Sequence, residues 1–245
     1  MIEYELKRTK RKTIGIKITL EGAVIVTAPL HLSERTIKKV IKEKEGWIRK
    51  KQEGILIAFQ KLAGNMAFLQ DKLLYLGIPY SVDLVLEPEF YKTTVGLYGE
   101  KIYIMSRVFD EIEMKKALEK WYREEARKVI QDRVALYRDQ IGVSVHSIFI
   151  KAQKTRWGSA STKGNLNFNW KLMMAPVEVI DYVVIHELCH LREMNHSKQF
   201  WELVSQYDEN YKAHRRWLKE NGSLLEASIQ NLALVNLEKK EEVKE

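Results

Sequence analysis

The sequence contains a single cysteine, Cys189, in 245 residues. A disulfide within the chain is therefore impossible, which is typical of proteins from reducing compartments, and we expect a cytoplasmic location. No apolar run approaches the roughly 18 to 20 residues that cross a bilayer, so we expect no membrane partner. The opening stretch, MIEYELKRTKRK, has neither the apolar core nor the small-residue cleavage site of a secretory signal. We therefore expect no signal peptide.

Internal repeats and clear linkers are also missing, as are zinc-finger, RRM and Walker patterns. Acidic residues are fewer than basic ones, 33 against 41, which leaves a formal charge of +8. Such a charge is compatible with plain solubility or with attraction to nucleotides, nucleic acid or acidic proteins. The densest basic clusters are KRTKRK (Lys7–Lys12) and KKVIKEK (Lys38–Lys44). We interpret the basic helix expected over residues 33–51 as a solvated face.

Hydrophobic periodicity predicts a mixture of strands and helices. Alternating apolar residues predict strands within residues 1–30, with KRTKRK as the turn of the first hairpin, and Ser33 is a good cap for the helix that follows. Further strands are predicted at residues 72–76, 80–86, 91–97, 101–105, 147–152, 155–159 and 165–170. Helices are predicted over 110–140, from Pro176 onward, and over 197–206 and 209–221. Residues 54–64 are ambiguous.

Three of the six histidines fall in the stretch HELCHLREMNH, from His186 to His196. On a helix, His186 and His190 lie on one face with Cβ atoms about 5 to 6 Å apart, so both imidazoles can bind one zinc ion. A catalytic zinc site keeps three protein ligands and leaves one position for water. Glu187 follows His186 directly, and its carboxylate can take a proton from that water. The alternative, ordinary histidines in a polar helix, is weakened by the third histidine that follows.

His196 can be the third ligand only if the helix ends before it. In an unbroken helix His196 would lie about 9 Å further along the axis than His190, too far for one ion to bind both. We therefore expect the chain to turn back, with Asn195 in the left-handed conformation that ends helices and Ser197 as the cap of the next helix. The sequence thus predicts His186, His190 and His196 as metal ligands.

The motif HExxHxxxxxH, together with TRWGSASTKGNLNFNWKLMMAPVEVIDYVVIHELCHL, resembles the YgjP-like metallopeptidase domain family, a group of zincins related to the SprT and WLM families. The resemblance covers nearly the whole chain. Matching positions outside the motif are Lys10–Thr13, Ala28–Pro29, Trp47–Ile48, Tyr75–Gly77 and Arg216–Leu218.

This resemblance implies an α+β, zincin-like fold in which the HExxH active-site helix packs on a small sheet. It implies Zn²⁺ as the metal, His186, His190 and His196 as its ligands, and Glu187 as the base. The element pattern adds an N-terminal β-rich lobe with one helix at residues 1–107, followed by the metal-binding catalytic region at residues 108–240. One continuous domain is compatible with the same pattern.

Two residues outside the motif are candidates for substrate binding. Arg156 could stabilise an oxyanion or bind a carboxylate or phosphate, although it could also be a structural arginine stacked on Trp157. Asn167 belongs to an alternating amide face, with Asn165 and Asn169 on either side of it. If this segment is an edge strand, the face borders the cleft; otherwise it simply meets water.

Three functions follow from these patterns. The leading hypothesis is a zinc-dependent metallohydrolase, specifically a metallopeptidase acting on polypeptides with Glu187 as general base. The second keeps the metal centre but cleaves nucleotide phosphoanhydrides, because a basic chain with Arg156 near the site could bind phosphates. The third is a nucleic-acid-associated binding protein. The sequence leaves these alternatives open.

Overall fold

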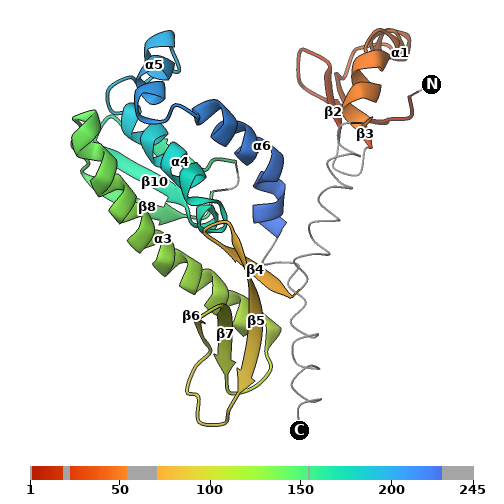
Figure 1. Ribbon diagram of the computed structural model, residues 1–245. Coiled ribbons are helices and arrows are strands. Elements are labelled where there is room, and N and C mark those ends of the chain that lie inside the picture. The colour runs from red at the N-terminus through yellow and green to blue at the C-terminus, as the bar shows by residue number, and fades with distance from the viewer. Residues whose placement is uncertain (1, 19–22, 54–70, 154, 228–245) are drawn as a thin grey trace. The chain divides into compact units, whose positions relative to one another are not determined.

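The computed structural model describes residues 2–18, 23–53, 71–153 and 155–227 (Figure 1). The chain divides into two compact units, Met1–Asn65 and Met66–Glu245. Each unit has a hydrophobic core of its own. The ambiguous segment at 54–64 lies outside the described residues. None of the helices in the described ranges is both long and apolar enough to cross a membrane.

The first unit is a small sheet covered by helix. Its elements are β1 (Glu5–Thr9), β2 (Gly15–Ile18), β3 (Val24–Pro29) and α1 (Glu34–Glu43). Residues 45–53 are also helical. As predicted, Ser33 caps α1, and its hydroxyl accepts a hydrogen bond from the Thr36 N–H at 3.2 Å. Ile37 and Ile41 of α1 are buried in the core of this unit.

The predicted first hairpin is wrong. The strand order is β1-β3-β2, with β3 parallel to β1 and antiparallel to β2, so β1 and β2 do not pair. The first half of KRTKRK belongs to β1, and the second half lies in the loop that leads to β2 on the opposite side of β3. Alternation of apolar residues predicts that a segment is a strand, but the partner of that strand depends on contacts with residues far away in the sequence.

The second unit contains two sheets. The first has the strand order β4-β5-β7-β6 and the second the order β8-β10-β9. Their strands are β4 (Lys72–Tyr75), β5 (Ile78–Leu86), β6 (Thr94–Tyr98), β7 (Lys101–Ser106), β8 (Ser147–Lys151), β9 (Gly158–Ala160) and β10 (Asn165–Asn169).

A long helix, α3 (Glu111–Ile141), connects the two sheets of this unit (Figure 1). It begins at Asp110, whose carboxylate caps two backbone N–H groups, and it ends at Gly142, whose φ of 74° is the left-handed conformation of a helix C-cap. Because α3 contacts β6, β7 and β8, strands β4–β7 belong to the second unit. The compact units thus divide at residue 65, earlier than the predicted division at residue 107.

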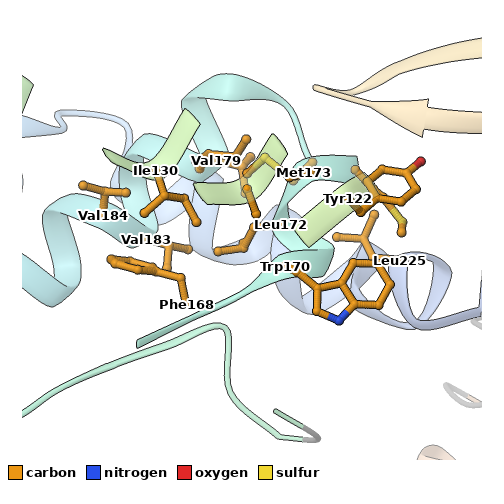
Figure 2. Packing of buried hydrophobic residues seen from close by; sticks show 14 of the residues in the cluster. Tyr122, Ile130, Phe168, Trp170, Leu172, Met173, Val179, Val183, Val184 and Leu225 are labelled. Carbon is orange, nitrogen blue, oxygen red and sulfur yellow. The ribbon is translucent and has the colours of Figure 1, made fainter. Parts of the chain in front are cut away.

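Helices α4 (Val177–Cys189), α5 (Lys198–Tyr207) and α6 (Tyr211–Ala227) complete the second unit. The short 3₁₀ helix η1 (Trp170–Met174) precedes α4, which contacts α3, α5, α6 and the edge strand β9. Figure 2 shows the shared core, in which Ile130 of α3, Phe168 of β10 and Val183 of α4 lie together. The architecture is α+β, as predicted, and its core fixes α4 in position.

Candidate metal centre

The motif helix ends where the three histidines require it to end. Helix α4 stops at Cys189, and His190 is its C-cap in right-handed conformation. Ser197 caps α5, as predicted, by accepting a hydrogen bond from the Phe200 N–H at 3.2 Å. The prediction for Asn195 is wrong, because Leu76 is the only non-glycine residue with positive φ in the described ranges. The helix already ends in right-handed turns at Cys189, so a left-handed residue is not needed later.

The three imidazoles converge on one point. The Nε2 atom of His196 lies 3.1 Å from that of His186 and 3.2 Å from that of His190. Ligand nitrogens at about 2.0 to 2.1 Å from a tetrahedral zinc ion are about 3.3 to 3.4 Å apart. These two distances, with all three donor atoms within 4.8 Å of one another, therefore fit a shared metal ion.

Each ring is held in place by packing or by a hydrogen bond. The Nδ1–H of His190 donates to the carbonyl of Glu193 at 3.1 Å, which leaves Nε2 of this ring free to bind a metal. His190 stacks on Phe200, with ring centroids 4.4 Å apart, and His196 stacks on Trp201 at 5.5 Å. His186 meets Phe200 edge-on, with ring centroids 4.9 Å apart, so helix α5 contacts all three rings.

Burial favours the neutral form of the histidines of α4. It lowers the pKa of His186 to about 3, and the neighbouring His190 and His196 act in the same direction. Burial also lowers the pKa of His190. Both imidazoles are therefore unprotonated near neutral pH, which is the form that binds metal.

Glu187 is buried beside the imidazoles, with 5% of its surface exposed. Burial raises the pKa of this carboxyl to about 8, and the positive charge of Arg156 acts in the opposite direction. Strand β9 passes close to this carboxylate. If Gly158 of β9 carried a Cβ atom, that atom would lie 2.6 Å from Glu187 Oε1. The carboxylate can occupy its position because β9 has no side chain there.

A pocket of about 350 Å³ opens beside His186 and Glu187. Its remaining lining includes Arg156, Arg215 and Lys219, so the pocket is basic. A larger hollow of about 570 Å³, next to residues 142–146, contains none of the four motif residues. The smaller, basic pocket is therefore the one that a substrate of the motif residues would occupy.

Arg156 and Asn167 differ in their relation to this pocket. Arg156 lines it, whereas Asn167 is absent from its lining and donates from Nδ2 to Ser159 Oγ at 3.3 Å. The idea that the Asn167 strand is an edge strand is wrong, since β10 lies between β8 and β9. The edge strand near Glu187 is β9.

Several supporting residues could not be identified from the sequence. Asn169 is 1% exposed, and its Nδ2 donates to the carbonyls of Gln153 at 2.9 Å and Arg156 at 3.4 Å. Asn169 thereby holds the segment that carries Arg156. The alternation of amide and apolar residues had instead predicted that this asparagine faces water or the cleft. The local signal for two others is the pair Phe200 and Trp201, which lies in the first turn of α5, shortly after the third histidine.

Comparison with known proteins identifies the family of the chain. A family model described as "YgjP-like, metallopeptidase domain" matches residues 12–221. No curated protein matches the chain. Among solved structures, the crystal structure of the metallopeptidase zymogen of Pyrococcus abyssi abylysin is similar at 24% identity and a TM-score of 0.34, covering 37% of this chain and 93% of that one. At this TM-score the likeness adds nothing to the assignment of the fold.

Proposed function

The chain belongs to the YgjP-like metallopeptidase domain family, and from this premise we propose that it is a zinc-dependent peptidase with its active site at His186, Glu187, His190 and His196. The observation that carries the proposal is the convergence of three imidazoles beside a buried carboxylate, with Nε2 of His196 at 3.1 Å from that of His186 and 3.2 Å from that of His190. A metallopeptidase needs this combination of a metal-binding triad and an adjacent base.

Zinc is the metal that the donor set favours. Three imidazole nitrogens and one open position are the ligand arrangement of catalytic zinc sites, although imidazole also suits copper, iron and nickel. Bound there, zinc would polarise the scissile carbonyl and increase the acidity of its water.

Glu187 has the position and the environment of a general base. It accepts a proton from the attacking water and later returns it to the leaving amine. Burial raises the pKa of this carboxyl to about 8, and the charge of a zinc ion bound beside it would favour the carboxylate form that accepts the proton. The lack of a side chain at Gly158 leaves room for the carboxylate beside the pocket.

Substrate binding is assigned to the basic pocket and the β9 edge. Arg156 lies where it can bind a carboxylate of the substrate or the oxyanion that develops on the carbonyl. Among the described strands β9 pairs only with β10, so its other side could add an extended peptide as a further strand. Asn167 contributes indirectly, by its hydrogen bond to Ser159 of β9.

Replacement of Glu187 tests this mechanism. We expect Glu187→Gln to keep the metal and to lower kcat by about 10²- to 10⁴-fold, the usual contribution of a general base. Peptidase assays with metal analysis measure both effects. Glu193→Gln, which changes an exposed side chain in the following turn, is the matched control and should behave like the parent. Full activity in the Glu187→Gln protein would disprove the assigned role.

A second candidate function is hydrolysis of nucleotide phosphoanhydrides. The observation in its favour is the basic lining of the pocket, since Arg156, Arg215 and Lys219 could bind a polyphosphate. Parallel assays with a peptide pool and with nucleoside triphosphates separate the two functions. Release of phosphate or pyrophosphate without proteolysis, abolished by Glu187→Gln, would replace the peptidase proposal.

A further inference from the structure

The net positive charge of the chain is confined to one of its two units. Residues 1–65 hold 15 of the 41 Lys and Arg residues but only 7 of the 33 Asp and Glu residues, a formal charge of +8. The 26 basic and 26 acidic residues of 66–245 leave the catalytic unit formally neutral. A charge that served solubility alone would not need to be separated in this way.

Helix α1 presents four of these cations on one face. At 3.6 residues per turn, Arg35, Lys38, Lys39 and Lys42 fall within an arc of about 100°. All four are exposed, while Ile37 and Ile41 on the other side of the helix are buried. Glu34 and Glu43 lie outside the arc, so the face carries charge of one sign.

This arrangement does not favour folding of the helix. Arg35 with Lys39 and Lys38 with Lys42 are like charges at i and i+4, each destabilising by about 0.2 to 0.5 kcal/mol. Helix α3 uses the opposite pattern, with ion pairs such as Lys115–Glu111 at 2.6 Å and Arg123–Glu119 at 2.7 Å. An anionic partner would remove the repulsion on α1.

Three more cations lie at the end of the sheet where α1 begins. Strands β1 and β3 are parallel and end together at Thr9 and Pro29, so the loop after β1 is close to the segment before α1. Arg8 Nη1 donates to the carbonyls of Pro29 and Leu32 at 3.2 and 2.6 Å, which ties these segments together. That loop carries Lys10, Arg11 and Lys12, all exposed.

We define the basic face as Lys10, Arg11, Lys12, Arg35, Lys38, Lys39 and Lys42. None of these seven residues forms an ion pair with a carboxylate in the described parts of the chain.

We propose that the basic face is a binding site for nucleic acid, which it holds by the phosphate backbone without reading the base sequence. Phosphate contacts by Lys and Arg supply essentially all of the affinity in binding of this kind. A membrane surface fits less well, because interfacial helices insert an apolar face and the apolar face of α1 is buried. An acidic protein fits less well, because α1 itself exposes no large apolar side chain to anchor it, and the exposed Leu30 and Trp47 lie before and after this helix.

The test measures binding of the full-length protein to labelled single-stranded and duplex DNA by fluorescence anisotropy, between about 50 and 200 mM salt. The variant R35Q/K38Q/K39Q/K42Q removes four cations from the basic face. The matched control K116Q/K120Q/R127Q/K128Q removes the same charge from exposed positions of α3. A second variant, K10Q/R11Q/K12Q, leaves α1 unchanged. It tests the basic face if the α1 variant misfolds.

The α1 variant should make the slope of log affinity against log salt shallower by about 3 to 4. Each phosphate neutralised by a cation contributes about 0.7 to 0.9 to this slope, and the variant removes four cations. Its affinity at about 50 mM salt should fall more than about tenfold, while the α3 control binds like the parent. Comparison of the two DNA forms shows which one the protein prefers.

Three results would overturn the proposal. The first is a lack of DNA binding at low salt, and the second is an equal loss of affinity in the α3 control. The third is tighter binding to polyglutamate or to anionic lipid vesicles than to DNA, which would assign the face to another class of partner.

Discussion

Gly158 and Glu187 illustrate how a residue without a side chain can determine the position of another, here the proposed general base. The Cβ that alanine would add at residue 158 lies 2.6 Å from Glu187 Oε1 and 2.9 Å from its Cδ. Real Cβ atoms do not approach so closely, so either the carboxylate or β9 has to move. Displacement of a catalytic group by about 1 Å can lower the rate about 100-fold.

We therefore expect Gly158→Ala to lower kcat/KM by about 100-fold while the protein still binds one metal ion per chain. Steady-state kinetics and metal analysis on the same preparation test this. Gly46→Ala is the control, since a Cβ there meets no atom within 4 Å and residue 46 is helical. That change should leave activity intact and stabilise its helix by about 0.5 to 1 kcal/mol. Unchanged kcat/KM in Gly158→Ala would contradict the assigned contact.

At the scale of elements, the metal centre depends on two helices joined by a short turn. Helix α4 supplies His186 and positions His190 at its end, while α5 supplies the aromatic rings that pack against the histidines. The first turn of α5 holds Phe200 and Trp201, so fraying of this turn would loosen the histidine rings that we propose as metal ligands. The stability of the start of α5 is therefore coupled to metal affinity.

Loss of the α5 cap should reveal this coupling. Ser197→Ala removes the hydroxyl that accepts the Phe200 N–H, and we expect it to cost about 1 kcal/mol of stability and to weaken zinc binding about tenfold. Ser33→Ala removes an equivalent cap from α1 and should cost a similar free energy without affecting zinc affinity. Chemical denaturation and a competitive zinc titration measure the two quantities. Equal zinc affinity in the two variants would show that the turn is not coupled to the site.

At the scale of the whole molecule, the catalytic and the basic surfaces belong to different units. The proposed zinc ligands all lie in Met66–Glu245, and the basic face lies in Met1–Asn65. Because each unit has its own core, a ligand of one unit should stabilise that unit alone.

Zinc at about 100 times its Kd should add about 2.7 kcal/mol to the unfolding free energy of the catalytic unit. For a unit of this size that raises Tm by about 5 to 10 °C, while the transition of the first unit stays in place. Calorimetry with and without a chelator measures the shift. His196→Ala should abolish the shift and the bound zinc, whereas His31→Ala, an exposed histidine of the first unit, should preserve both. A zinc-dependent shift that persists in His196→Ala would remove this residue from the ligand set.

Much of the site could be predicted because it depends on residues close together in the sequence. The i, i+4 spacing of His186 and His190 and the cap at Ser197 are local features. Helix formation and capping involve contacts within a few residues, so a pattern in the sequence is sufficient to predict them. The same reason explains the agreement at Ser33.

Tertiary structure decided everything that joins distant segments. It placed β3 between β1 and β2, made β10 a central strand, buried Asn169 and brought Gly158 against Glu187. It also set the boundary that leaves all of the net charge in one unit. Strand pairing and burial result from many weak contacts between segments that are far apart in the sequence, and a local pattern of residues does not contain that information.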